Sequence, residues 1–257
     1  MVEKDRSTLN AVAAALRGAR RVLVITGAGI SADSGLPTYR GIGGLYQDED
    51  TEDDVPIEVA LSGQMMRMRP ELCWKYIHQI ERSCRGARPN AAHTALVRLQ
   101  DRFEQLTVLT QNIDGFHLDA GSRDLIEIHG NVRRLQCTGC GHERTVGDFT
   151  GLRIPPACAE CGALVRPRVV LFGEMLPEEA LARLYGVLER GVDAVLSVGT
   201  TSVFPYIAAP VLEAARRGVP TVEINPGDSE VSGRVRYRLR ERAAVALPLL
   251  EDALGVR

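Results

Sequence analysis

The stretch Val22-Leu23-Val24-Ile25-Thr26-Gly27-Ala28-Gly29-Ile30-Ser31 decides the fold of this 257-residue chain. Four apolar residues in a row, bounded by glycine, predict a strand that is buried on both faces, as in a parallel sheet covered by helices. Glycines directly after such a strand are typical of a turn whose backbone N–H groups approach a phosphate. The stretch therefore predicts a nucleotide-binding α/β fold.

Similar apolar runs recur further along the chain, with helical patterns between several of them. The runs cover Leu106–Thr110, Leu125–Ile128, Ala194–Val198 and Val219–Ile224, and the helical patterns cover Pro177–Arg190 and Tyr206–Arg217. Strands that alternate with helices predict a Rossmann-like parallel sheet. We therefore predict an α/β chain with a Rossmann-like domain (1–38, 92–132 and 168–257) and a smaller inserted module (39–91 and 133–167).

The overall charge gives no reason to expect a nucleic acid or an anionic membrane as the main partner. Lys and Arg number 31 and Asp and Glu number 33, which gives a net charge of −2. The first ten residues lack the basic and apolar pattern of a secretory signal, and no stretch approaches the roughly 20 apolar residues of a membrane span. We therefore expect a cytoplasmic protein with reduced thiols.

Four of the six cysteines form two Cys-x-x-Cys pairs, Cys137 with Cys140 and Cys158 with Cys161. The spacing between the pairs is typical of a four-thiolate zinc ribbon. Four thiolates fill a tetrahedral coordination sphere and leave no position for water, so we predict one structural zinc ion. Two redox-active dithiols and unrelated core cysteines are the alternatives. His142 is interpreted as a solvated turn residue, because the cysteines already suffice.

The other two cysteines, Cys73 and Cys84, fall on one face of a predicted helix together with Ile77 and Ile80. A helical separation of this length excludes a disulfide between them. Both are interpreted as buried core thiols.

The glycine turn departs from the usual dinucleotide fingerprint. Asp33 stands in place of the third glycine, and the acidic run Asp48-Glu49-Asp50 follows a loop instead of a second strand. An ordinary dehydrogenase is therefore disfavoured.

The wider set of motifs closely resembles the sirtuin family. They occur in the family's order over about 200 residues: Gly27–Arg40, Thr110–Gly115, His129-Gly130, the four cysteines, Pro167–Glu174, Gly199–Ser202 and Ile224-Asn225. The resemblance implies an NAD-dependent protein-lysine deacylase that acts on acylated lysines of protein substrates. In that reaction the acyl oxygen attacks the nicotinamide ribose and expels nicotinamide, and the products are free lysine and O-acyl-ADP-ribose.

By resemblance, the catalytic residues are His129 and Asn112. His129 activates a ribose hydroxyl. An imidazole with a pKa near 6.5 can accept a proton at neutral pH. The other implied residues divide into two sets. Those for NAD are Gly27, Ala28, Gly29, Ile30, Ser31, Gly35, Tyr39, Arg40, Gln111, Asn112, Ile113, Asp114, Gly199, Thr200, Thr201, Ser202 and Asn225; those for the substrate are Val170, Phe172, Gly173 and Phe116. From the residues alone, Asn112 and Asp114 also suit strand-end turns, and Val170 also suits core packing.

The acyl group is expected to be neutral. Sirtuins that remove succinyl or malonyl groups carry a Tyr and an Arg three residues apart, and Ile77 and Ile80 occupy those positions here. Acetyl is therefore the first choice, followed by longer neutral chains.

Two alternatives stay open. One is an NAD-consuming mono-ADP-ribosyltransferase or NAD hydrolase on the same scaffold, and the other is a silent NAD- or zinc-binding module. Two departures from the family pattern bear on the NAD site: Pro205 comes one residue early, and Tyr39 stands where Phe is more usual.

Overall fold

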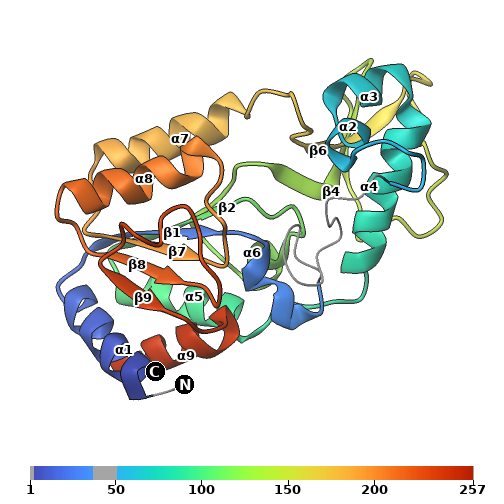
Figure 1. Cartoon of the computed structure of the whole chain (residues 1–257). Helices are drawn as coiled ribbons and strands as arrows, with labels where there is room; N and C mark the ends of the chain where they lie inside the picture. The colour runs from blue at the N-terminus through green and yellow to red at the C-terminus, as the bar shows by residue number, and fades with distance from the viewer. Residues whose placement is uncertain (1–2, 37–50, 257) are drawn as a thin grey trace.

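Parallel strands form the larger of two sheets (Figure 1). The structure, a computed structural model, describes residues 3–36 and 51–256. The sheet order is β3-β2-β1-β7-β8-β9, so the chain runs outward from β1 to β3 and then, from β7 onward, to the opposite edge. The strands are β1 (Arg21–Thr26), β2 (Gln105–Thr110), β3 (Leu125–Glu127), β7 (Ala194–Val198), β8 (Thr221–Ile224) and β9 (Tyr237–Leu239).

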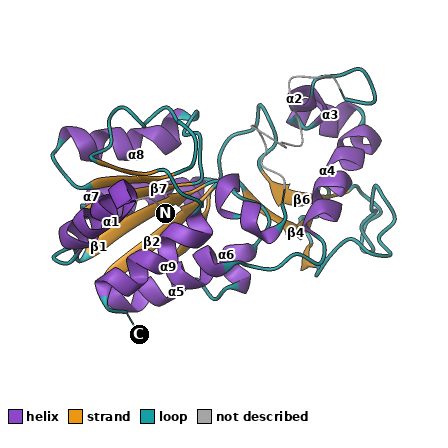
Figure 2. Cartoon of the chain, turned by 60° about the horizontal axis from the view of Figure 1, so that its bottom comes forward, coloured by secondary structure: helices purple, strands orange, loops and turns teal. Residues whose placement is uncertain are grey.

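Helices cover both faces of this sheet (Figure 2). On one face lie α1 (Glu3–Leu16), α5 (Ala91–Arg102) and α9 (Ala243–Leu254), and on the other lie α7 (Glu178–Glu189) and α8 (Pro205–Arg216). Because side chains alternate along a strand, Val22 and Val24 pack toward the first group while Leu23 and Ile25 pack toward the second. β1 is therefore buried on both faces, as its sequence predicts.

A smaller region lies beside the sheet and has its own apolar core. It contains the antiparallel strands β4 (Gly130–Cys137), β5 (Glu143–Thr145) and β6 (Val165–Val169), with α2 (Ile57–Ala60), α3 (Gly63–Met68) and α4 (Pro70–Cys84). Trp74 connects helix α4 to the strands of this region. Its indole N–H donates to the Val165 carbonyl on β6 at 3.0 Å, and its ring packs against Phe149. Short helical turns η1 (Ala28–Ile30), η2 (Ala32–Ser34) and α6 (Phe116–Asp119) complete the elements near the sheet.

The predicted Rossmann-like α/β fold with a smaller module is confirmed. The strand predicted from Val219 begins at Thr221, because Pro220 has no N–H to donate to the ladder. The predicted boundaries at 132/133 and 167/168 fall inside β4 and β6, so these strands run from one region toward the other.

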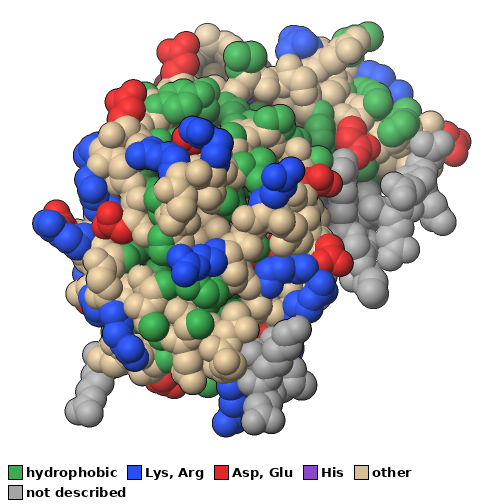
Figure 3. Space-filling view, turned by 60° about the vertical axis from the view of Figure 1, so that its left-hand side comes forward, with side chains coloured by type: hydrophobic (Ala, Val, Ile, Leu, Met, Phe, Trp, Pro, Cys, Tyr) green, Lys and Arg blue, Asp and Glu red, His purple; other side chains and the backbone are tan. Residues whose placement is uncertain are grey.

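Helices of the described chain are all too short or too polar to cross a bilayer. On the face shown in Figure 3, basic side chains are interspersed with acidic ones.

Candidate functional site

A cleft of about 570 Å³ opens where the carboxyl ends of β1, β2, β3, β7 and β8 meet. The strand order reverses between β1 and β7, and open α/β sheets bind ligands at such a switch point. The volume lies in the range of small-molecule sites. Most of the predicted site residues line it: Gly27, Ala28, Gly29, Ser31, Gln111, Asn112, Ile113, Asp114, His129, Val170, Phe172, Gly173, Gly199, Thr200, Thr201 and Asn225.

Four predicted residues do not line the cleft: Ile30, Gly35, Ser202 and Phe116. Ile30 is fully buried in the core on the α1 side of the sheet, and Phe116 is buried with its ring against His93. Ser202 is buried as well, with its hydroxyl 3.5 Å from that of Ser197 inside the sheet. These side chains therefore support the walls of the cleft. Tyr39 and Arg40 lie outside the described residues.

The glycines after β1 allow two loops to touch. A Cβ on Gly29 would lie 2.7 Å from the Gly199 Cα, and one on Gly27 would lie 2.7 Å from the Thr200 Cβ. Their N–H groups are already bonded, since Gly27 donates to the Val198 carbonyl and Gly29 to the Gly199 carbonyl. Close packing of the two loops therefore requires these glycines, whatever the turn also binds.

Polar side chains after β2 fix the floor of the cleft. The Asn112 amide donates to the Gly27 carbonyl and to the Ser31 hydroxyl, each at 3.2 Å, and Ser31 donates to Asp114 at 2.7 Å. Burial raises the pKa of Asp114, although the Phe116 N–H and the Ser31 hydroxyl donate to its carboxyl group. The Gln111 amide donates to the Thr200 hydroxyl at 2.8 Å and so connects β2 to the loop after β7.

His129 follows β3 and faces this network. Its Nδ1 lies 2.9 Å from the Gln111 carbonyl, which can only accept a hydrogen bond. Nδ1 therefore carries the proton, and Nε2 has a lone pair. Burial lowers the pKa of His129, while the Gln111 carbonyl acts in the opposite direction. The ring is thus a neutral base at physiological pH.

Sequence reasoning missed two aromatic residues of the cleft. Tyr206 places its hydroxyl 2.6 Å from Nε2 of His129, and Phe204 stacks on the Tyr206 ring with the centroids 5.5 Å apart. Both directly follow the predicted loop Gly199–Ser202, so the early Pro205 was the available signal.

Part of the cleft wall is apolar and comes from the smaller region. Ile77 and Ile80 on α4 both line it, as the acyl-group prediction requires, together with Leu61. Cys84 lines it too, so its interpretation as a core thiol is wrong, because this last residue of α4 is only half-buried. Cys73 is fully buried, as predicted. Burial raises the pKa of both thiols to about 12, so neither is a nucleophile at neutral pH.

Glu174, at the edge of the cleft, is bound within the protein. Its carboxylate accepts two hydrogen bonds from the Arg166 guanidinium, at 2.6 and 2.8 Å, and one from the Leu171 N–H. Burial acts to raise the pKa of Glu174, but the hydrogen bonds from Arg166 and from the Leu171 N–H, together with nearby positive charge, outweigh burial and lower it. The carboxylate therefore holds Leu171 and its neighbours in place along the cleft.

Two further histidines lie behind the cleft wall. His93 closes a capping box at the start of α5, which gives it a structural role, and its ring centroid lies 4.9 Å from that of His117. Burial lowers the pKa of His93 to about 4, and burial together with His93 lowers that of His117 to about 3.

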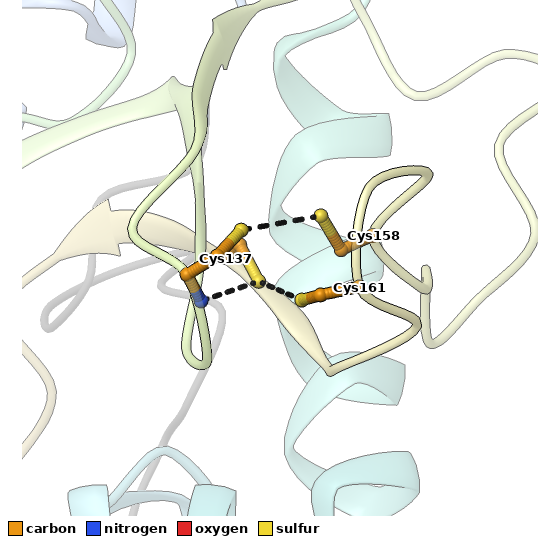
Figure 4. Close-up of side chains that lie close together, drawn as sticks. Cys137, Cys158 and Cys161 are labelled. Atoms are coloured by element: carbon orange, nitrogen blue, oxygen red, sulfur yellow. Dashed lines mark hydrogen bonds between the residues drawn. The ribbon is translucent and has the colours of Figure 1, made fainter.

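The four paired cysteines converge in the smaller region (Figure 4). Their sulfur atoms all lie within 4.8 Å of one another, with Cys137 3.4 Å from Cys161 and Cys140 3.7 Å from Cys158. A tetrahedral ion with Zn–S bonds of about 2.3 Å separates its sulfur ligands by about 3.8 Å, so the cluster fits zinc. The N–H groups of Cys140 and Gly139 point at the Cys137 sulfur and lower its pKa to about 6. His142 is exposed, as expected.

Comparison with known proteins agrees with this geometry. The model of the Sir2 family matches residues 27–205. NAD-dependent protein deacylase 2 of Pseudomonas aeruginosa is 53% identical over 247 residues, which cover 95% of this chain and 96% of that protein. The NAD-dependent protein deacylase of Aquifex aeolicus is 36% identical over 91% of this chain and 95% of its own.

Solved structures give the same result. A Sir2 homologue in complex with 2'-O-acetyl ADP ribose aligns with a TM-score of 0.84 at 33% identity, over 99% of this chain and 97% of its own. A Sir2 homologue in complex with NAD aligns with a TM-score of 0.83 at 33% identity, over 97% of this chain and 94% of its own. A Sir2 complex with p53 peptide and NAD+ aligns with a TM-score of 0.80 at 27% identity, over the whole of both chains. The chain belongs to the Sir2 family, which confirms the sirtuin resemblance.

Proposed function

We propose that the switch-point cleft removes acetyl and longer neutral acyl groups from lysine side chains of proteins, with His129 as the general base. The chain is an NAD-dependent protein deacylase, as its relatives at 53% identity are named. The observation that supports the residue assignment best is the meeting of Asn112, Asp114 and His129 in a single cleft. A mono-ADP-ribosyltransferase activity is not favoured, because the curated relatives are deacylases.

The residues present fit NAD at the cleft. Side-chain amides and hydroxyl groups of Gln111, Asn112, Ser31 and Asn225 face a volume at the carboxyl ends of the strands. We propose that these groups hold the ribose and nicotinamide half, and that the loop after β7 holds the adenosine half. When bound, NAD supplies the ribose that receives the acyl group, and nicotinamide is released.

The chain's own contribution is proton transfer, orientation and exclusion of water. The Gln111 carbonyl holds the His129 ring by Nδ1, so that Nε2 is the basic atom in the cleft. The Asn112 amide, fixed by Gly27 and Ser31, orients groups beside the base. Apolar side chains of Val170, Phe172 and Ile113 surround the lysine stem and exclude water from the reacting atoms.

Among the described residues of α4, no Lys or Arg lines the part of the cleft proposed to hold the acyl group. Ile77 and Ile80 present an apolar wall, which favours an uncharged acyl chain over a carboxylate because a buried, unpaired charge is costly. We therefore propose acetyl-lysine as the first substrate and longer neutral acyl groups next.

A single assay tests this function. The protein is incubated with NAD and a peptide that carries lysine in the acetylated, succinylated or unmodified form, and nicotinamide and acyl-ADP-ribose are followed by mass spectrometry. We expect both products with the acetylated peptide, much less with the succinylated peptide and none with the unmodified one. Nicotinamide release that ignores the acyl group would support an ADP-ribosyltransferase or NAD hydrolase, and faster succinyl removal would refute the pocket assignment.

We further propose a cytoplasmic location and one structural zinc ion per chain. Thiols are kept reduced in the cytosol, and zinc-binding cysteines must be reduced, so the four-cysteine cluster supports the proposed location.

A further inference from the structure

The tyrosine beside the catalytic histidine is a feature of the cleft with no role in the function proposed above. The Tyr206 hydroxyl lies 2.6 Å from Nε2 of His129, and both residues line the same cavity. Since Nδ1 carries the ring proton toward the Gln111 carbonyl, Nε2 can only accept. The Tyr206 hydroxyl is therefore the donor, and it occupies the lone pair with which His129 would receive a proton.

The Tyr206 ring is held in this position from two sides. Tyr206 is the second residue of α8, and the next residue, Ile207, is fully buried in the core. The Phe204 ring stacks on Tyr206 at an interplanar angle of 14° and meets the His129 ring edge-on, with the centroids 5.8 Å apart. Displacement of the Tyr206 hydroxyl would disturb the packing of these three rings. A proton therefore reaches Nε2 at the lowest cost by passing through the Tyr206 hydroxyl.

A neutral phenol can pass a proton on. Its oxygen donates one hydrogen bond to Nε2 and keeps lone pairs that accept another from the cavity side. Burial raises the pKa of Tyr206 to about 12, so the group stays a phenol at neutral pH.

We propose that Tyr206 relays the proton between the ribose hydroxyl of the bound nucleotide and Nε2 of His129. The inference rests on the proposed deacylase function. In the step, Tyr206 accepts the hydroxyl proton as it gives its own proton to Nε2. The electron pair of the broken O–H bond forms the new bond to the acyl carbon. The π electron pair of that carbon's double bond to the lysine nitrogen, in the positively charged adduct of acyl-lysine and ribose, moves onto the nitrogen. Tyr206 ends as a neutral phenol and His129 as an imidazolium, so protons and charge balance.

Tyr206→Phe tests the relay, because it removes only the hydroxyl. Nicotinamide exchange into NAD in the presence of acetyl-peptide precedes this proton transfer, so we expect exchange within about twofold of the unmodified protein, while kcat for deacetylation falls at least about tenfold. The matched control is Tyr185→Phe on α7, because Tyr185 is 56% exposed and does not line the cleft. This control is expected to leave both rates unchanged.

A second readout needs no nucleotide. In the ligand-free protein, the ¹⁵N resonance of His129 Nε2 is expected to shift in Tyr206→Phe, because the nitrogen loses its hydrogen-bond donor. An unshifted resonance overturns the hydrogen bond on which the relay depends.

The kinetic outcomes are equally decisive. Undiminished deacetylation by Tyr206→Phe overturns the relay, because it shows that the ribose hydroxyl reaches His129 directly. Equal losses in exchange and deacetylation also overturn it, because they assign Tyr206 to the support of the pocket. Failure of the deacylase function would be seen separately, as absent acetyl-dependent nicotinamide release by the unmodified protein.

Discussion

The zinc cluster and the cleft differ in the length of sequence that separates their residues. The four sulfur ligands come from two turns between positions 137 and 161, whereas the residues that line the cleft run from Gly27 to Asn225. A cluster made by two short turns depends on local spacing, whereas the cleft exists only after five strands have paired in the correct order. Damage to the cluster should therefore unfold a region, and damage to the cleft should remove chemistry without unfolding.

Loss of a zinc ligand is expected to have the largest effect. Cys158→Ala leaves three thiolates, and structural zinc sites contribute on the order of 10 kcal/mol, comparable to the whole stability of a domain. Because Cys137 and Cys158 pack in the same core as Trp74 and Leu171, the apolar wall of the cleft is lost with them. We expect metal content by mass spectrometry to fall from one ion per chain and activity to vanish. His142→Ala, an exposed neighbour, is the control and should keep one ion; a fully metallated, folded Cys158→Ala protein would contradict the assignment.

His129→Ala tests the cleft in the same way: it should remove activity without loss of zinc or of folding. General base catalysis contributes about 10²–10⁴-fold, so we expect deacetylation to fall by that factor, with zinc content and thermal midpoint unchanged. His78→Ala is the matched control, since His78, on α4, packs beside Phe149 and does not line the cleft. Loss of zinc or a large loss of stability in His129→Ala would show that the two sites are not independent.

The acyl wall predicts a smaller change. Ile80→Arg places a cation in the cleft, and a hydrogen bond to a charged group contributes about 1.5–3 kcal/mol. We expect the ratio of succinyl to acetyl kcat/KM to rise about tenfold or more, whereas Ile80→Met leaves it unchanged. An unaltered ratio in Ile80→Arg would mean that α4 does not face the acyl group.

The buried histidine pair predicts an effect on stability that is confined to acidic pH. His93 and His117 have pKa values of about 4 and about 3 in the folded protein, against about 6.5 when unfolded. Below pH 6.5 the unfolded state binds more protons, so stability falls as the pH drops toward 4, by up to about 1.4 kcal/mol per pH unit for each histidine. Urea unfolding at pH 7 and pH 5 measures this loss. The free energy of unfolding should fall less between the two pH values for His117→Gln than for the unmodified protein. Equal falls would exclude the pair as the cause.

The sequence predicted the zinc ligands and most of the fold, because both depend on short-range patterns. Apolar runs bounded by glycine locate the strands, and two Cys-x-x-Cys pairs define the cluster. Family motifs also gave most of the cleft residues, including His129 and Asn112.

The remainder depends on contacts that spacing does not encode. Tyr206 is far from His129 in sequence and meets it only because β3 and β7 lie on opposite sides of the sheet centre and end at the same edge. Cys84 belongs to the cleft because α4 ends there, and the glycines of the first turn are explained by a loop that follows β7. Ile30 lies within one family motif and Phe116 directly follows another, yet both side chains are buried in the core.

Metal replacement tests most directly the central claim that the cleft performs the reaction while zinc only holds the smaller region together. Cobalt can replace zinc at a tetrahedral four-thiolate site, where it keeps the geometry and changes the Lewis acidity of the ion. The structure predicts that the cobalt protein, with one ion per chain, keeps kcat and kcat/KM for NAD-dependent deacetylation within about twofold, since no ligand position is open to substrate. A change in kcat that follows the identity of the metal would contradict the claim.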